Sequence, residues 1–214
     1  MLVLAHRGLH AEVPENTIEA FRCAVTVGCD GIETDLRVAA DGEVLLFHDR
    51  LAPDGTPVEA LSRRALSGLV GYAVPSLAEA LEAEPETLWN LEIKTRATVP
   101  PTLRLLRPLR GRRRVLCTSF IHAAVVELVE ALGVEGGFLV AHDPLRGAAE
   151  LGLHPRVRRL VFDVTTVSGE TLQSAADARI ATMVYGVVDA ADHGIALRYG
   201  VAGIITDAPE RLPR

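Results

Sequence analysis

The sequence has 214 residues, of which 49% are hydrophobic and 23% charged, and we expect one domain over residues 1–214 with a sizeable buried core. Its net charge of −6 argues against nucleic acid as a partner, and the one basic run, at residues 110–114, is short enough to be a solvated loop. The three cysteines have neither the even count of a disulfide framework nor the spacing of a zinc site.

The chain opens with the apolar run MLVLA, which is interrupted at once by His6 and Arg7. Such a start lacks the charged and apolar regions of a secretory signal peptide, and no later apolar run approaches the length of a membrane span. We therefore expect a cytoplasmic protein with no stable membrane anchor.

Short apolar runs that are rich in β-branched residues recur along the chain and predict buried strands. They lie at Leu2–Ala5, Gly31–Val38, Val44–Phe47, Leu88–Ile93, Val115–Thr118, Gly137–Ala141, Leu160–Val164, Met183–Val188 and Gly203–Thr206. Helical spacing of apolar residues occurs between most of them, at Thr17–Val27, Ser76–Ala83, Thr102–Leu109, Ala123–Leu132, Pro144–Leu151, Glu170–Arg179 and Ala190–Tyr199, with a capping signal at Asn16 and Glu19. This alternation is typical of an α/β fold with a parallel sheet.

One pair of these strands is too close in sequence to be parallel. Only residues 39–42 separate Val38 from Glu43, which predicts an antiparallel hairpin with an Asp-Gly turn. Eight parallel strands then remain, the number of a TIM-like (β/α)8 barrel. The stretch Arg50–Pro75 has no clear helical period and predicts a short loop or insertion over one end of the barrel.

Catalytic groups of such barrels lie at the C-terminal ends of the strands, so polar residues at those ends are candidates for a site. They are His6, Arg7, Glu33, Asp35, His48, Asp49, Glu92, Lys94, Ser119, Thr206 and Asp207. Because side chains alternate along a strand, Glu33 and Asp35 share one face of their strand. Two carboxylates that point into one barrel mouth repel each other unless a cation lies between them.

The acidic residues predict a metal site. If Val38 pairs with Glu43 across the hairpin, His48 falls opposite Glu33 and joins the acids. Glu33, Asp35 and Glu92 then supply three hard oxygen ligands, which suit one Mg²⁺ or Ca²⁺ better than Zn²⁺, with Mn²⁺ as a further candidate. His6 and His48 remain free to act as general acid and base near neutral pH.

Lys94 is the only lysine in the chain, against 21 arginines. A lysine ammonium contacts phosphate as a compact point charge, whereas an arginine guanidinium contacts it as a planar fork. Arg7 and Lys94 are therefore both candidates to hold an anionic group of the substrate.

The motifs AHRG, PENT, GIETDL, LLFHD, LEIKT, TSF and GIITDAP occur in this order between residues 5 and 209. The series resembles that of the glycerophosphodiester phosphodiesterase family and covers nearly the whole chain. The resemblance implies a TIM-like barrel, one divalent metal on Glu33, Asp35 and Glu92, and His6 and His48 as general acid and base. It also implies that Arg7 and Lys94 contact the substrate phosphate.

The sequence departs from the family pattern at two places. The family usually has Trp-Thr-Val-Asn at the seventh strand, whereas this chain has Tyr185-Gly186-Val187-Val188, which changes an aromatic wall beside the substrate. The usual Arg-Thr-Thr run soon after His-Asp is absent from HDRLAPDG. Neither departure touches the expected metal ligands or histidines, but both leave the head-group preference open.

Several further residues have alternative interpretations. Glu15 and Asn16 shape the site in the family, although Asn16 and Thr17 could instead be no more than a helix cap. Asp207 either caps the last turn or positions the mouth of the site. Ser119 lacks a nucleophile elbow, which argues against a serine hydrolase and leaves it a supporting residue. The remaining histidines are expected at the surface, without acidic partners: His10, His122, His142, His154 and His193.

The expected activity is metal-dependent hydrolysis of a small-molecule glycerophosphodiester to glycerol 3-phosphate and an alcohol. Two alternatives use the same pocket: a lysophospholipase D, which requires an apolar groove, and a non-catalytic phosphate-binding module. The sequence leaves open the nucleophile, which is water or the glycerol 2-hydroxyl, and which histidine is the acid. It also leaves open the oligomeric state.

Overall fold

The computed structural model describes residues 1–145, 148–151 and 154–211. Its strands are β1 (Leu2–His6), β2 (Gly31–Val38), β3 (Val44–Leu46), β4 (Leu88–Ile93), β5 (Arg114–Ser119), β6 (Glu135–Val140), β7 (Arg159–Asp163), β8 (Ala181–Val187) and β9 (Gly203–Thr206). All of them except β3 run parallel to their neighbours, in the order β1-β9-β8-β7-β6-β5-β4-β2, and β1 also pairs with β2. The eight parallel strands therefore close into the barrel that the sequence predicts.

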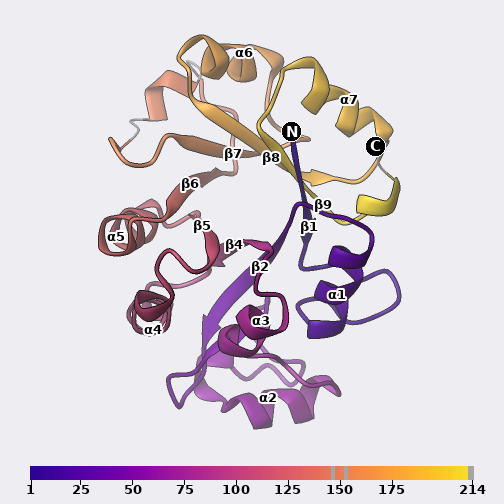
Figure 1. The fold of residues 1–214 in the computed structure, drawn as a ribbon, viewed down its shortest axis with the longest axis vertical. Coiled ribbons are helices and arrows are strands. Elements are labelled where there is room, and N and C mark those ends of the chain that lie inside the picture. Colours follow the sequence, from indigo (N-terminus) through magenta and orange to yellow (C-terminus); the bar gives the residue numbers. More distant parts are fainter. Residues whose placement is uncertain (146–147, 152–153, 212–214) are drawn as a thin grey trace.

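The helices are α1 (Ile18–Thr26), α2 (Arg63–Val70), α3 (Leu77–Ala83), α4 (Val99–Leu106), α5 (His122–Leu132), α6 (Gly169–Asp177) and α7 (Ala190–Arg198). They lie around the outside of the strands (Figure 1). Side-chain caps fix several of their starts: Ser76 and Glu79 form a capping box on α3, and Asp189 accepts hydrogen bonds from two backbone N–H groups of α7. None of the helices in the described ranges is long and apolar enough to cross a membrane.

The barrel interior is filled by apolar side chains below the polar residues of its mouth. Leu4, Leu116, Leu139, Val161, Met183 and Ile205 form one cluster, and each comes from a different strand. Two larger clusters lie between the strands and the outer helices. Polar groups at the mouth are thus held on a rigid, close-packed support.

The hairpin between β2 and β3 is present, but the predicted register is wrong by one residue. Val38 pairs with Val44 rather than with Glu43. The cause is Gly42, whose φ of +83° adds a bulge residue after a tight turn in which its N–H binds the carbonyl of Ala39. Regular pairing ends before His48, so this histidine does not lie opposite Glu33 in the ladder.

Three helix predictions also need correction. The stretch Arg50–Pro75 contains helix α2, which Ser62 caps at its start and which Gly71, at φ +79°, ends. Helix α4 begins earlier than residue 102, because prolines in the first helical turn lose no hydrogen bond. The helix predicted at 144–151 is only a short 3₁₀ turn over Ala148–Leu151, and residues 146–147 lie outside the described residues.

Candidate active site

A cavity of about 150 Å³ opens at the C-terminal ends of the barrel strands. Its charged lining comes from β1, β2, β4, the residues directly after β1 and β4, and the segment after β3: His6, Arg7, Glu33, His48, Glu92 and Lys94. Asn90 on β4 and Thr118 on β5 add neutral polar groups. Its apolar lining comes from later strands, with Leu139 on β6, Tyr185 on β8 and Phe120 directly after β5. The two histidines predicted as acid and base therefore line one cavity with two of the three predicted metal ligands.

Three carboxylates converge at this mouth. Ligand oxygens of Glu33, Asp35 and Glu92 all lie within 4.8 Å of one another. The strand register explains their convergence, because Asp35 on β2 is the direct neighbour of Glu92 on β4 and Glu33 lies two residues before Asp35. Glu33 and Asp35 are buried, with 2% and 1% of their surface exposed.

Burial and mutual repulsion perturb these acids. Burial raises the pKa of Glu33 well above its usual value, and the nearby charges of Asp35 and Glu92 raise it further. Burial, with the charge of Asp35, also raises the pKa of Glu92. Burial would raise the pKa of Asp35 too, but the opposite charges of Lys94 and Arg7 outweigh it and lower this pKa overall.

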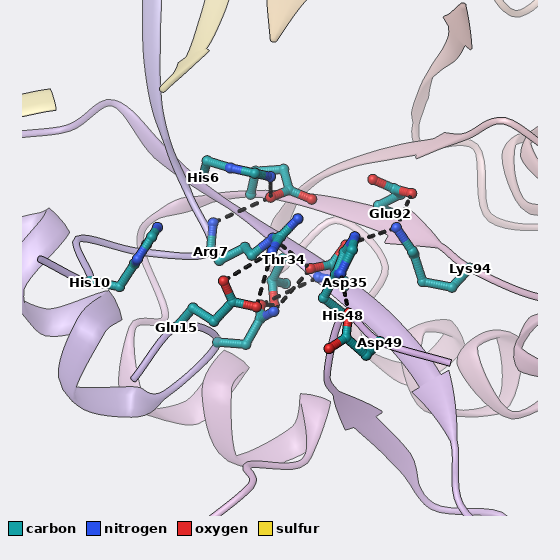
Figure 2. Close-up of polar contacts among 12 residues, drawn as sticks. His6, Arg7, His10, Glu15, Thr34, Asp35, His48, Asp49, Glu92 and Lys94 are labelled. Atoms are coloured by element: carbon teal, nitrogen blue, oxygen red, sulfur yellow. Dashed lines mark hydrogen bonds and ion pairs between the residues drawn. The ribbon is translucent and has the colours of Figure 1, made fainter. Parts of the chain in front are cut away.

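Two cations hold the acidic cluster together. Arg7 places Nε 3.1 Å from Asp35 Oδ2 and donates from Nη1 to both oxygens of Glu15, at 3.0 and 2.9 Å. Lys94 Nζ lies 2.8 Å from Glu92 Oε1 and 3.2 Å from Asp35 Oδ1 (Figure 2). Each cation bridges two carboxylates, which offsets their repulsion.

Each of the two histidines has a carboxylate on Nδ1. His6 Nδ1 lies 2.6 Å from Asp207 Oδ1, and His48 Nδ1 lies 2.9 Å from Asp49 Oδ1. This hydrogen-bond pattern assigns the proton of the neutral ring to Nδ1 and leaves Nε2 as an acceptor. The Nε2 of His6 lies 3.8 Å from Glu33 Oε2, at the edge of the acidic cluster.

Nearly the full chain matches a known family: the model of the glycerophosphoryl diester phosphodiesterase family matches residues 6–211. The chain belongs to this family. As a glycerophosphodiester phosphodiesterase it is a phosphoric diester hydrolase, as the sequence predicts.

Relatives of this phosphodiesterase span it almost completely. A glycerophosphodiester phosphodiesterase from Caldanaerobacter subterraneus is 28% identical, over 99% of this chain and 96% of that protein. The crystal structure of a glycerophosphodiester phosphodiesterase from Thermotoga maritima has a TM-score of 0.80 at 26% identity, over 98% of this chain and 95% of that chain. An Oleispira antarctica phosphodiesterase, solved with the product sn-glycerol-3-phosphate, shares the fold with a TM-score of 0.83 at 21% identity, over 98% and 94%.

A partial match points to a second activity among the relatives. A lysophospholipase D from Rattus norvegicus is 32% identical over 116 residues, which are 45% of this chain and 37% of that protein.

The acidic cluster of the phosphodiesterase can hold a metal ion. Glu33 Oε1 is buried and has no hydrogen-bond partner among the described residues, so an acceptor is left unsatisfied where the three carboxylates meet. The donors are all oxygens, which fits a hard cation such as Mg²⁺ or Ca²⁺.

The supporting residues fall into two groups, neither of which lines the cavity. Glu15 and Asn16 contact the acidic cluster and its cation: Glu15 accepts from Arg7, Asn16 Nδ2 donates to Asp35 Oδ2 at 2.9 Å, and Asn16 Oδ1 accepts from the Thr34 hydroxyl at 2.6 Å. Of the two residues predicted as a possible helix cap, Thr17 caps α1 and Asn16 does not. Ser119 does not line the cavity; its hydroxyl donates to the Ile93 carbonyl and accepts from the Ile121 N–H.

Three of the remaining histidines contradict the expectation of surface positions without acidic partners, and one of them is His154, whose Nε2 lies 3.4 Å from Glu130 Oε1. His10 Nε2 lies 3.2 Å from Asp207 Oδ1, so Asp207 joins His10 and His6. The hydrogen bond to Asp207 raises the pKa of His10, and those two histidines hold the pKa of Asp207 well below its usual range. His193 is 6% exposed and buried within α7. In the sequence, the one indication that His10 lies near the site is its position four residues after His6, in the loop that follows β1.

Asn90 and Phe120 are among the cavity residues that the sequence did not predict. Asn90 is fully buried, and its Oδ1 accepts a hydrogen bond from the Thr118 hydroxyl at 2.9 Å, while its Nδ2 has no partner. The sequence could have predicted Asn90 as a site residue, because it lies two residues before Glu92 and this spacing places both side chains on one face of β4.

Proposed function

We propose that the protein hydrolyses glycerophosphodiesters to glycerol 3-phosphate and an alcohol in a metal-dependent reaction, with His6 and His48 as the acid–base pair. One observation carries the proposal: both histidines line the same small cavity as the converging carboxylates. The name of the family and the product bound in the Oleispira antarctica relative support the choice of substrate.

Glu33, Asp35 and Glu92 would hold one divalent cation, for which we propose Mg²⁺ or Ca²⁺, with Mn²⁺ as a further candidate. When bound, such a cation supplies Lewis-acid stabilisation of charge on a non-bridging phosphate oxygen. Arg7 and Lys94 border the same cavity with side chains that are 17% and 15% exposed. We propose that they contact the remaining phosphate oxygens while staying anchored to their carboxylates.

The two histidines divide the proton transfers. One Nε2 accepts the proton of the nucleophile, and the other imidazole, when protonated, gives a proton to the leaving alkoxide. Asp207 and Asp49 hold the rings through Nδ1 and so orient each Nε2. The nucleophile is water or the glycerol 2-hydroxyl, and only the second route releases a cyclic phosphate.

A product assay tests this function. The protein, freed of metal with a chelator, is incubated with glycerophosphocholine or glycerophosphoethanolamine, with and without Mg²⁺, Ca²⁺ or Mn²⁺. We expect metal-dependent release of glycerol 3-phosphate, and ³¹P NMR during the reaction detects any cyclic phosphate. Full activity of the chelated protein would contradict the metal assignment, and binding of substrate without turnover would favour the non-catalytic module.

Lysophospholipase D activity is the second candidate. The apolar wall of Phe120, Leu139 and Tyr185 supports it, since an acyl chain needs such a surface, and so does the partial match to the Rattus norvegicus lysophospholipase D. A lysophospholipid in the same assay distinguishes the two. Release of lysophosphatidic acid faster than glycerol 3-phosphate would replace the first proposal with the second.

A further inference from the structure

A second cavity, of about 390 Å³, lies at the opposite end of the barrel from the active site. Leu2, Leu88, Arg114, Glu135 and Arg159 line it, and each is the first residue of a strand, from β1, β4, β5, β6 and β7. This end of such a barrel usually serves stability alone. We propose that the cavity, named here the basal cavity, binds a phosphate-bearing small molecule.

The charge of the basal cavity supports an anionic ligand. Arg110, Arg113, Arg114 and Arg159 line it, against one acidic residue, Glu135. Arginine stays charged at any physiological pH, so these groups repel one another until an anion lies among them. This concentration of positive charge stands out in a chain with a net charge of −6. The basic run at residues 110–114 is mostly exposed, as the sequence suggests, and it lines the basal cavity through Arg110, Arg113 and Arg114.

The pairing of these arginines is incomplete. Arg159 Nη2 lies 2.8 Å from Glu135 Oε2, but its Nε is buried and has no hydrogen-bond partner. Within the described residues, Arg110 and Arg114 form no ion pair with a carboxylate. Arg113 is oriented by carbonyl groups alone, those of Leu81 and Arg112. Guanidinium groups with unused donors match the several acceptor oxygens of a phosphate group.

The backbone holds one of these side chains in place. Gly133 ends α5 with a φ of +68°, and a Cβ atom added there would lie 2.8 Å from Arg110 Nη2. The guanidinium of Arg110 thus packs on the bare backbone of Gly133 at the edge of the basal cavity. The remaining lining includes Leu116, Leu132 and Val134, which would contact an apolar part of the ligand.

Isothermal titration calorimetry at constant ionic strength tests the proposal, with inorganic phosphate and phenyl phosphate as probes. Wild type is compared with Arg110→Gln, with Arg114→Gln and with the double variant. We expect each substitution to weaken binding about tenfold through the loss of a charge-assisted hydrogen bond. Phenyl phosphate should bind more tightly than inorganic phosphate if the apolar lining takes part, and equal affinities would identify the free anion as the ligand class.

Arg112→Gln is the matched control, because Arg112 belongs to the same basic run but does not line the basal cavity. It should bind both probes like wild type, and kcat/KM for glycerophosphocholine should stay unchanged in every variant. Phosphate binding at the active site alone would leave the Kd of the double variant unchanged and overturn the proposal. An equal loss of binding in the control would overturn it as well, since generic surface charge would then explain the effect.

Discussion

The two halves of the active-site mouth are built from different chemistry. The charged groups lie on or directly after β1, β2 and β4 and are paired with one another. The apolar groups are Phe120 directly after β5, Leu139 on β6 and Tyr185 on β8. Because phosphate is anionic and the alcohol half of a phosphodiester varies, the charged half suits the reacting centre and the apolar half suits the leaving group. Substitutions in the two halves should therefore differ in kind as well as in size.

Glu33→Gln should have the largest effect. The amide lacks the charge that a divalent cation requires, and we expect kcat/KM to fall by at least about 10³-fold, equivalent to several kcal/mol of lost transition-state stabilisation. The metal-free variant should unfold at a higher temperature than metal-free wild type, because the buried repulsion with Asp35 and Glu92 is relieved.

Thermal unfolding with and without Mg²⁺ provides a readout independent of turnover. Wild type should be stabilised by the metal, and Glu33→Gln should not. Glu86→Gln removes an exposed acid and should respond to metal like wild type. A metal-induced shift that survives in Glu33→Gln would place the cation elsewhere.

His6→Ala and His48→Ala should each lower kcat by about 10²- to 10⁴-fold with little change in KM. A nitrophenyl phosphodiester, whose leaving group needs no proton, should restore the rate of only one of the two variants, and that variant lacks the acid. Steady-state kinetics on both substrates measure this, with His154→Ala as the control. Equal rescue of both variants would show that the histidines do not divide the work as proposed.

Phe120→Ala should have a smaller effect, confined to substrate binding. Phe120 is 47% exposed and meets the Tyr185 ring edge to face, with centroids 6.3 Å apart. Losing this pair should raise KM by at most about tenfold and leave kcat nearly unchanged. Leu197→Ala, at an exposed site on α7, is the control. A 10²-fold or larger fall in kcat, on the scale of general acid–base catalysis, would contradict the assignment of the apolar half to substrate binding alone.

Asp207→Asn should lower the free energy of unfolding by a small amount that depends on pH. His10 and His6 lower the pKa of Asp207, so the carboxylate stabilises the fold above its ordinary pKa, about 3.9, and loses this contribution as the pH falls. The raised pKa of His10 adds stability that is lost as the pH rises through that pKa.

The difference in unfolding free energy between wild type and Asp207→Asn should therefore be largest between about pH 4 and pH 7, and at most about 1 kcal/mol for such exposed partners. Chemical denaturation across this range measures it. A difference that keeps growing below pH 4 would contradict the pairing.

Strand order and the acidic cluster could be predicted because both depend on simple periodicity. Buried parallel strands are continuous apolar runs, and residues two apart on a strand share a face, which is enough to bring Glu33, Asp35 and Glu92 together. The hairpin register could not be predicted as easily. A bulge at Gly42 changes the register by one residue, and the Asp-Gly turn is compatible with either pairing.

Hydrogen-bond partners that are distant in sequence explain the wrong predictions for Asn16 and His10. Asn16 has the residue type of a helix cap, but its side chain binds Asp35 instead, and only the packed strand β2 makes that partner available. The acid that pairs with His10 is Asp207, 197 residues away in the sequence, and no local pattern indicates that pairing. The helix α2 was missed because its short sequence has few buried positions, with Leu66 as its one buried residue.

The closure of the barrel has a consequence for protein synthesis. His6 is the last residue of β1, which pairs with both β2 and β9, and its Nδ1 partner Asp207 follows β9 at a separation of 201 residues. A nascent chain therefore carries its first histidine long before the carboxylate that orients it has been translated. Because such long-range contacts form late, the His6 ring is oriented by Asp207 only when the C-terminal strand docks, and a chain terminated before β9 has no oriented His6.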